Sequence, residues 1–184
     1  MKVICISGKA GSGKDTVAEM MCAQLNLRGK RVLITHYGDL VKYVCRAFFG
    51  WNGEKDEVGR SLLQYVGTDR VRSQSPDYWV NFIASMLTFF DDEWDVVLIP
   101  DCRFPNEAEL MTHFYGFDAT IVRINRPDMK SKLTAEQQVH ESETAMDNYD
   151  FDHVITNSGS LNDLRELTIN FVEMILEDAN DNPG

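Results

Sequence analysis

Residues 8–16 combine three glycines with a lysine and read Gly-Lys-Ala-Gly-Ser-Gly-Lys-Asp-Thr. They follow an apolar run at 3–6 and precede a segment with helical spacing. Glycines allow a strand to turn tightly into a helix, and the freed backbone N–H groups then face an anion at the helix N-terminus. The pattern predicts a phosphate-binding loop whose lysine, Lys14, reaches the β and γ phosphates of a nucleotide. The residues expected to hold the nucleotide phosphates are Gly8, Ala10, Gly11, Ser12, Gly13, Lys14, Asp15 and Thr16.

The residue after the lysine departs from the usual pattern of these loops. A hydroxyl residue that binds magnesium normally stands there, whereas this chain has Asp15, with Thr16 one place later. The magnesium ligand therefore stays open among Asp15, Thr16 and Asp101. The competing interpretation is a glycine-rich turn with an incidental lysine, which the flanking strand and helix disfavour.

A carboxylate and an arginine follow the third apolar run of the chain. Residues 96–101 read Val-Val-Leu-Ile-Pro-Asp, and Arg103 comes two residues later. Parallel sheets bind ligands outside the carboxyl ends of their strands, so Asp101 could meet magnesium or a phosphate acceptor near Lys14. Arg103 is expected to bind phosphate, because a guanidinium can donate two parallel hydrogen bonds. The alternative for Asp101 is to cap the next helix.

Polar residues recur every fourth position between the second and third runs. Arg60, Gln64, Thr68 and Arg72 would form a slowly drifting stripe on one helix, which suggests ligand recognition. The alternative is a solvated helix face, and Gly67 could interrupt the helix. Two further candidates for the acceptor, Asp39 and Lys42, follow the second run, although their spacing equally suits a surface ion pair.

Arg126 follows the fourth apolar run and could neutralise charge on the transferring phosphoryl group. The stretch Asn-Arg-Pro-Asp at 125–128 superficially resembles a guanine-reading box, but it lacks the lysine, and no switch motif follows the third run. A switch GTPase is therefore disfavoured. His140 and Glu143 have the spacing of a metal pair without further ligands, so a lid or hinge hydrogen bond is favoured for His140.

The elements that position these groups can be predicted from five apolar runs bounded by polar or turn residues. These runs predict strands at 3–6, 32–35, 96–99, 120–124 and 154–155. Apolar residues with helical spacing lie between them, at 17–25, 79–90 and 161–175. Strands that alternate with helices predict a three-layer α/β fold, with a five-stranded parallel sheet and helices on both faces. We expect the chain after Asp178 to fray.

Two stretches interrupt this alternation. Residues 39–90 insert helices between the second and third strands, and residues 127–152 are polar. An acceptor pocket and a closing lid would occupy such insertions, because phosphoryl transfer must exclude water. Ordinary surface loops are the alternative for the second stretch.

The chain has 184 residues and a formal net charge of -11, which suits a single domain, 1–184. The acidic balance argues against binding a nucleic-acid polymer, which needs many lysine and arginine contacts. Four scattered cysteines predict buried thiols in a reducing cytoplasm, and no apolar run is long enough for a signal peptide or a membrane span.

The inventory of groups also bears on the reaction. A hydrolytic ATPase often carries an acidic residue directly after the carboxylate of its third strand, whereas Cys102 stands there. An anionic phosphate acceptor has less need of a base, so positioning and charge neutralisation supply most of the rate. The sequence offers many arginines and no obvious general base, which favours a phosphate acceptor. Asp39 or Asp101 could still act as the general base for a hydroxyl acceptor.

Several runs together resemble the phage-type deoxynucleoside monophosphate kinase family. They are the loop at 8–16, the Leu-Gln-Tyr-Val-Gly-Thr-Asp-Arg run at 63–70 through Trp79, the Pro-Asp-Cys-Arg-Phe-Pro-Asn-Glu run at 100–107, and His-Glu-Ser-Glu at 140–143. The resemblance implies a P-loop kinase fold, ATP with Mg²⁺ as donor and a deoxynucleoside monophosphate as acceptor. It supports roles for Lys14, Arg103 and Arg126 in catalysis.

The same resemblance extends the set of expected contacts. It implies Asn157 and Gly159 near the donor adenine. The full set of residues expected to contact the substrate is Asp39, Lys42, Arg60, Gln64, Arg72, Trp79, Asp101, Arg103 and Glu143. Trp79 could stack on a base or belong to the core. Kinases of other phosphorylated metabolites, such as phosphomevalonate, and a non-catalytic nucleotide-binding module are the alternatives. A homodimer is open, because the apolar stripe at 79–90 suits a core or a dimer contact.

Overall fold

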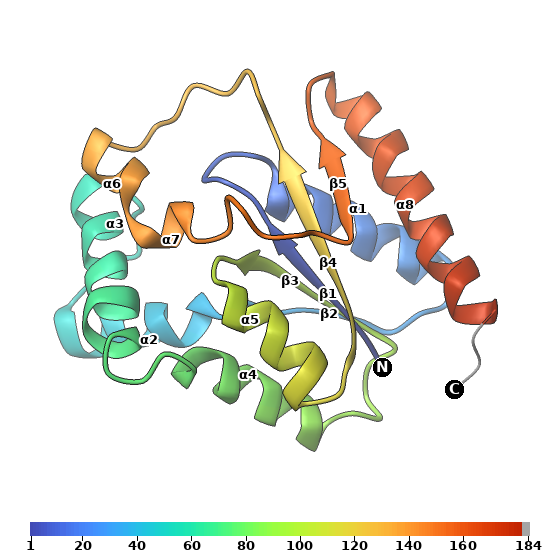
Figure 1. Cartoon of the computed structure of the whole chain (residues 1–184), viewed down its shortest axis with the longest axis horizontal. Coiled ribbons are helices and arrows are strands. Elements are labelled where there is room, and N and C mark those ends of the chain that lie inside the picture. The colour runs from blue at the N-terminus through green and yellow to red at the C-terminus, as the bar shows by residue number, and fades with distance from the viewer. Residues whose placement is uncertain (182–184) are drawn as a thin grey trace.

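A computed structural model describes residues 1–181 and contains one parallel sheet with the strand order β2-β3-β1-β4-β5 (Figure 1). The strands are β1 (Lys2–Ser7), β2 (Val32–Ile34), β3 (Val96–Cys102), β4 (Asp118–Asn125) and β5 (His153–Thr156). All four pairings are parallel, which confirms the predicted sheet and its five strands.

Helices cover both faces of the sheet, as predicted for a three-layer fold. Successive residues of β1 point to opposite faces, so Val3 and Cys5 join one core cluster while Ile4 and Ile6 join the other, all fully buried. One cluster is closed by α1 (Lys14–Leu27) and α8 (Leu161–Asp181), which lie together on one side in Figure 1. The other is closed by α2 (Gly38–Phe49), α4 (Tyr78–Phe89), α5 (Pro105–Glu109) and the π-helix η2 (Leu110–Phe114).

Two predicted helical stripes are partly wrong at their edges. Phe90, the last residue of the stripe at 79–90, is exposed and lies just beyond α4. Leu161 and Leu167 of α8 are exposed, whereas Thr168 is fully buried, because the inward face of this helix runs through Leu164, Thr168 and Phe171. The Thr168 hydroxyl is satisfied by donating to the Leu164 carbonyl at 2.7 Å. The fraying expected at the end of the chain is not seen as far as Asp181, where α8 ends, and otherwise falls outside the described residues.

The helical insertion at 39–90 divides into two parts. Helices α2 and α4 bury apolar residues against the sheet and belong to the outer layer. Only α3 (Glu57–Gln64) and the π-helix η1 (Tyr65–Arg72) form a separate wall, beside α2 in Figure 1. The insertion therefore supplies part of the outer layer and, in α3 and η1, a wall that stands apart from the sheet.

The polar segment 127–152 crosses from the top of β4 to that separate wall. It carries two short helices, α6 (Ala135–Val139) and α7 (Glu141–Thr144). Gln137 of α6 is buried and its Nε2 donates to the Glu57 carbonyl and the Ser61 hydroxyl, both at 3.2 Å. The segment is thus docked on α3, and we refer to residues 127–152 as the lid segment.

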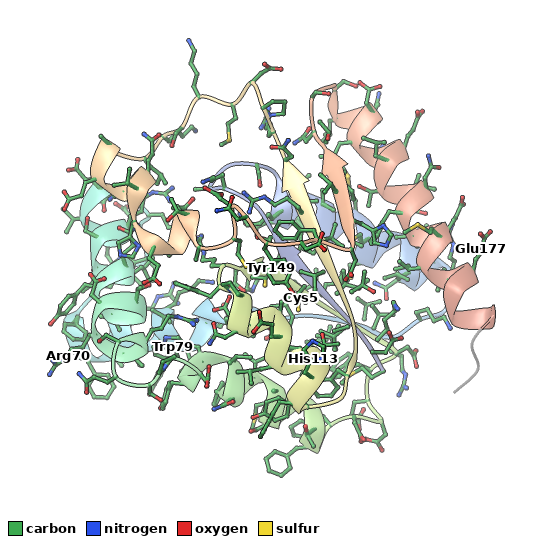
Figure 2. The ribbon with its side chains drawn as sticks, in the orientation of Figure 1. Cys5, Arg70, Trp79, His113, Tyr149 and Glu177 are labelled. Carbon is green, nitrogen blue, oxygen red and sulfur yellow. The ribbon has the colours of Figure 1, made fainter. Side chains whose placement is uncertain are left out.

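All four cysteines are free thiols. Cys5, Cys45 and Cys102 are buried as predicted, and Figure 2 shows Cys5 in the interior of the molecule. Cys22 is only half-buried, on α1, which corrects the prediction for that thiol. Within the described residues, no helix is both long and apolar enough to cross a membrane.

Candidate active site

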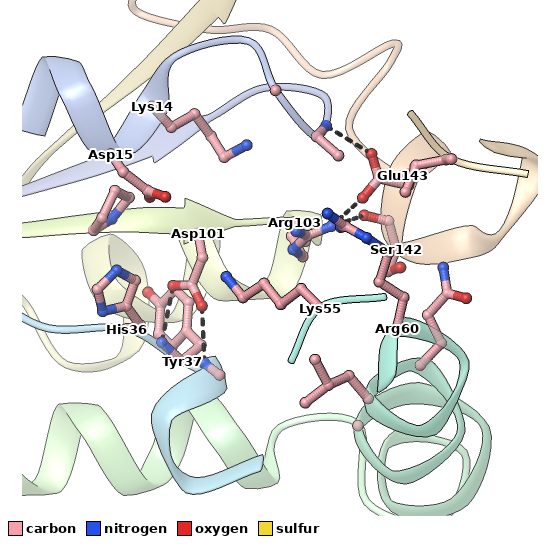
Figure 3. A pocket seen from close by; sticks show the side chains of 18 of the residues that line it. Lys14, Asp15, His36, Tyr37, Lys55, Arg60, Asp101, Arg103, Ser142 and Glu143 are labelled. Carbon is pink, nitrogen blue, oxygen red and sulfur yellow. Dashed lines mark hydrogen bonds and ion pairs between the residues drawn. The ribbon is translucent and has the colours of Figure 1, made fainter. Parts of the chain in front are cut away.

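A cavity of about 830 Å³ opens at the carboxyl ends of the strands (Figure 3). Its walls come from the phosphate loop, the start of α2, the α3–η1 wall, the end of β3 and the lid segment. The predicted site residues that line it are Ala10, Gly11, Lys14, Asp15, Lys42, Arg60, Gln64, Arg72, Trp79, Asp101, Arg103, Arg126, Glu143, Asn157 and Gly159. One cavity thus brings together residues from positions 10 to 159.

The phosphate loop has the backbone that its glycines predict. Gly11 and Gly13 have φ angles of 85° and 103°, which other residues rarely adopt. A side chain at Gly8 would lie 2.6 Å from the Ile124 carbonyl oxygen, so β4 also requires glycine there. Gly8, Ser12, Gly13 and Thr16 build the loop and the first turn of α1 but are not among the lining residues.

Lys14 is buried, and its ammonium is held by the loop itself. Nζ donates to the Gly8 carbonyl at 2.7 Å and to the Lys9 carbonyl at 3.0 Å. Desolvation, followed by the positive charge of Arg103, lowers the pKa of Lys14 to about 8. A polyphosphate would relieve both effects.

Asn157 fastens the phosphate loop from behind. Its Nδ2 donates to the Ser12 carbonyl at 2.9 Å, and its backbone N–H donates to the Asn125 carbonyl at 2.7 Å. Asn157 and Gly159 also line the cavity, next to the loop. The predicted contact with adenine stays a prediction, but the loop-holding role of Asn157 was not foreseen.

Asp101 does cap a helix, but not the one that follows it. Its two carboxylate oxygens accept the backbone N–H groups of Tyr37 and Gly38, each at 2.9 Å, at the start of α2. These contacts are drawn as dashed lines in Figure 3. Asp101 lines the cavity at the same time, so it joins the end of β3 to the start of α2 at the edge of the cavity.

Asp39 does not line the cavity, whereas Lys42 does. The Asp39 carboxylate accepts from Lys42 Nζ at 2.8 Å and lies 3.3 Å from His36 Nδ1. The hydrogen bond with His36, followed by that with Lys42, lowers the pKa of Asp39 far below its usual range. The surface ion pair that its spacing allowed is therefore formed, and Asp39 is not brought to the acceptor.

The stripe of Arg60, Gln64, Thr68 and Arg72 faces the cavity along its whole length. Gly67 does not break the helix: from Tyr65 the backbone continues as the π-helix η1. A π-helix has more residues per turn than an α-helix, which suits a four-residue spacing and reduces the drift. Gly67 itself packs against Val41 of α2.

Arg72 is engaged by protein partners, although it lines the cavity. Nη1 donates to the Pro76 carbonyl and the Asn106 side chain, both at 2.9 Å, and Nη2 pairs with Glu107. The guanidinium also lies over the Phe104 ring, 3.8 Å from its centroid. Within the described residues, Nε is buried without a hydrogen-bond partner, so most of the donor capacity of Arg72 is used by the protein.

Glu107 is a buried carboxylate that was not among the predicted site residues. Besides Arg72, it accepts the backbone N–H of Arg103 at 2.6 Å and of Phe104 at 3.1 Å. Burial raises the pKa of Glu107 to about 7, against the opposing charge of Arg72. The sequence offered one indication of its importance, because Glu107 ends the run at 100–107 that carries the family resemblance.

Trp79 satisfies both interpretations in part. It is 3% exposed within the core, and its indole N–H donates to the Gly67 carbonyl at 2.8 Å. It also borders the cavity beneath η1, and Figure 2 shows it at the base of that wall. The stripe of α4 that could have served a dimer contact is used in the core through Trp79, Ile83 and Leu87.

Arg126, directly before the lid segment, and Glu143 within it border the remaining side of the cavity. Arg126 Nη1 lies 3.4 Å from the Gly11 carbonyl, and Glu143 bonds with the phosphate loop and with Arg103. His140 forms the lid hydrogen bonds predicted for it: Nδ1 lies 2.9 Å from the Ser142 hydroxyl and Nε2 lies 3.2 Å from Asp69. Within the described residues, no three acidic, histidine or cysteine side chains gather as a metal site.

Several other lining residues were missed by sequence reasoning. His36, Lys55, Lys130 and Lys132 line the cavity from loops and the start of α2. Isolated lysines in loops carry no spacing signal, so the sequence offered no basis for choosing them. Figure 3 shows the Lys55 side chain extending into the cavity toward Asp101.

A sequence profile described as deoxynucleotide monophosphate kinase matches residues 42–168, most of the chain. The chain belongs to this family. The matched residues include the α3–η1 wall, the end of β3 and the lid segment, but not the phosphate loop. The family assignment therefore rests on the acceptor side of the cavity and is independent of the loop that many enzymes share.

Known proteins agree with the family assignment. The deoxynucleoside-5'-monophosphate kinase of Escherichia phage T5 is 29% identical over 120 residues, which are 64% of this chain and 47% of that protein. The chain thus aligns with about half of this curated relative.

Among solved structures, a mutant of the Mycobacterium tuberculosis APS kinase has a TM-score of 0.52 at 17% identity, over 94% of this chain and 96% of that one. Aquifex aeolicus shikimate kinase has a TM-score of 0.53 at 15% identity, over 99% and 100%. These likenesses show the P-loop kinase fold.

Proposed function

We propose that the protein transfers the γ-phosphate of ATP to a deoxynucleoside monophosphate, giving ADP and a deoxynucleoside diphosphate. The observation that carries the proposal is a single cavity with a phosphate loop on one wall and the family's α3–η1 segment on the other. The phage T5 relative, which is named for the same activity, supports it.

The charge of the cavity supports two anionic substrates. Nine of the 18 lysines and arginines of this acidic chain line it, against five of the 29 acidic residues. Six of the nine have no carboxylate within 4.0 Å among the described residues: Lys14, Lys55, Arg60, Arg126, Lys130 and Lys132. Unpaired cations gathered in one cavity attract phosphates and compensate their mutual repulsion.

Each group then has a role set by its wall. Lys14 and the loop N–H groups bind the β and γ phosphates, and Arg126 neutralises the transferring phosphoryl group from the lid side. Arg103 binds the acceptor phosphate at the end of β3, opposite Lys14. Arg60, Gln64 and the neighbouring stripe contact the rest of the acceptor. No base is required, because the acceptor phosphate is already ionised near neutral pH.

The carboxylates present fit Mg²⁺ bound with ATP. Magnesium uses one or two carboxylates together with phosphate oxygens and water. Asp15 lines the cavity and makes no hydrogen bond within the described residues, while Asp101 retains lone pairs beside its two backbone contacts. These two residues would hold the ion, whose charge would stabilise the phosphate oxygens. Thr16 does not line the cavity and is the weaker candidate.

The remaining features belong to the same proposal. The acceptor is a small molecule rather than a nucleic-acid polymer, and the free thiols suit the cytoplasm. The homodimer stays a prediction that sedimentation can check.

An ADP-release assay with Mg·ATP and a panel of monophosphates tests the function. We expect ADP release that depends on a deoxynucleoside monophosphate, and a loss of at least about 100-fold in kcat for Lys14→Met, because the buried charge is removed from the transition state. Lys30→Gln, at the far end of α1, is the matched control. ADP release only with phosphorylated non-nucleotide acceptors, or with none, would contradict the proposal.

A further inference from the structure

The Glu143 carboxylate joins two parts of the cavity that are distant in sequence. One oxygen accepts the backbone N–H of Ala10 in the phosphate loop at 2.9 Å, and the other pairs with Nη1 of Arg103 (Figure 3). The same Nη1 donates to the Ser142 carbonyl at 3.1 Å. The Glu143 side chain is only 5% exposed, so both of its oxygens are used by the protein.

The lid segment is fixed on both sides of Glu143. Before it, Gln137 is bonded to α3 and His140 to Asp69 of η1. After it, the Asp147 carboxylate pairs with Lys9 Nζ at 2.6 Å and with Arg123 at 3.1 Å. Lys9 Nζ also donates to the Glu143 carbonyl at 2.9 Å. The position of the Glu143 carboxylate is therefore fixed by contacts of the lid segment with the α3–η1 wall on one side and with the phosphate loop on the other.

This arrangement gives Arg103 a defined direction. An arginine side chain loses rotamer entropy when it binds a phosphate, and a buried carboxylate partner removes much of that freedom beforehand. Because Nη1 is taken by Glu143 and the Ser142 carbonyl, the other nitrogens are left to face the cavity. In-line transfer is sensitive to the distance between donor and acceptor phosphates, so orientation of this guanidinium bears on rate.

We propose that Glu143 is a positioning residue, which fixes the Arg103 guanidinium relative to the phosphate loop and makes this alignment depend on the docked lid. The inference rests on the proposed function and deepens it. It replaces the expected contact of Glu143 with substrate by an action through Arg103. Glu143 thereby couples the donor loop, the acceptor arginine and the lid through one carboxylate.

A double-mutant cycle in the full-length protein tests the inference. Glu143→Gln should lower kcat about 10- to 100-fold, the scale of a misplacement near 1 Å, with a smaller change in the KM for ATP. In the Arg103→Met background the same substitution should change kcat less than about twofold, because its target is gone. Additive losses, or unchanged kcat in Glu143→Gln, would overturn the proposal. Glu141→Gln removes the same charge from an exposed position of α7 and should behave as wild type.

A measurement without turnover separates this inference from the proposed function. The arginine side-chain N–H resonances of Arg103, assigned with Arg103→Lys, should be slow to exchange in the wild type and in Glu141→Gln, and fast in Glu143→Gln. Glu143→Asp, which keeps the charge but is too short to reach both partners, should fall between them if Glu143→Gln folds poorly. Equal exchange in all variants contradicts positioning, whereas absent acceptor-dependent ADP release in the wild type contradicts only the proposed function.

Discussion

Lys14 shows how one side chain can be prepared for an anion. Its ammonium is removed from water and held by two carbonyls of its own loop, with Arg103 as a second nearby cation. Burial and the neighbouring cation disfavour the charged lysine, and the nearby carboxylates, Glu143 first among them, offset this only in part. A polyphosphate supplies the missing negative charge, so binding should stabilise the protonated lysine.

The affinity for ATP should accordingly decrease at alkaline pH. In the free protein Lys14 loses its proton near pH 8, whereas bound phosphate keeps the proton on to higher pH, so binding above pH 8 requires proton uptake. We expect a constant Kd below about pH 7.5 and weakening of up to about tenfold per pH unit above pH 8. Calorimetric titration of ATP from pH 6.5 to 9.5 measures this. If the Kd for ATP depends on pH in the same way in Lys14→Met, the proton taken up on binding belongs to another group.

Single residues were predictable where the chemistry lies within a short stretch. Lys14, Arg103 and Arg126 could be chosen because a loop or a strand end carries each to the sheet edge. Their partners could not, since Glu143 meets Ala10 across 133 positions and Asp101 caps a helix 63 positions earlier. Such pairs depend on which strands become neighbours in the sheet, and a local sequence pattern does not determine the order of the strands.

At the scale of elements, the Arg72–Glu107 pair ties η1 to α5. It is buried at both ends, with side chains 9% and 3% exposed, and it lies directly beneath the cavity. The contact holds the α3–η1 wall against the helix that follows β3. It therefore fixes the distance between the polar stripe and Arg103.

Arg72→Met should destabilise the protein increasingly above pH 7, toward about 3 to 5 kcal/mol, the cost of a broken buried pair, because it leaves a buried carboxylate without its cation. The sign with pH follows from Glu107, whose raised pKa of about 7 would rise further without Arg72. Below pH 7 the Glu107 carboxyl is largely protonated in the folded state of both proteins, so the difference between them should be small there and should grow above pH 7 by up to about 1.4 kcal/mol per pH unit. Urea unfolding at pH 5 and 8 measures the difference.

The paired substitution Arg72→Met with Glu107→Gln is the control. It should recover part of the stability and remove the pH dependence. An equal loss for Arg72→Met at both pH values would mean that packing against Phe104, rather than charge, dominates.

The elements themselves were largely predictable. Alternating apolar runs and helical stripes located all five strands and the main helices, because each buries a face of regular period. The change from α3 into a π-helix was not predictable, since Gly67 read as a helix breaker. Its place against Val41 shows that tertiary packing decided the backbone there.

At the scale of the whole molecule, charge is strongly segregated. A chain of net charge -11 places half of its basic residues in one cavity. The outer surface should repel phosphates at long range while the cavity attracts them. Attraction of this kind is screened by salt over roughly 8 Å at physiological ionic strength.

The association rate of a fluorescent nucleotide should fall about tenfold between 0.01 M and 0.3 M salt. Lys55→Gln, in the cavity, should reduce both the rate at low salt and its salt dependence. Lys30→Gln changes the net charge equally but lies exposed at the opposite end of α1, so it should alter neither. Stopped-flow measurements compare the three proteins, and equal salt slopes would show that the cavity charges do not steer binding.

The strand order also sets when the phosphate loop can exist during synthesis. β1 lies between β3 and β4, and Asn157 secures the loop from the end of β5. The loop precedes in the chain the neighbours that shape it, which end at Cys102, Asn125 and Thr156. A nascent chain that has not released β4 from the ribosome cannot enclose β1, so the loop becomes competent to hold a nucleotide only after β3, β4 and Asn157 have been synthesised.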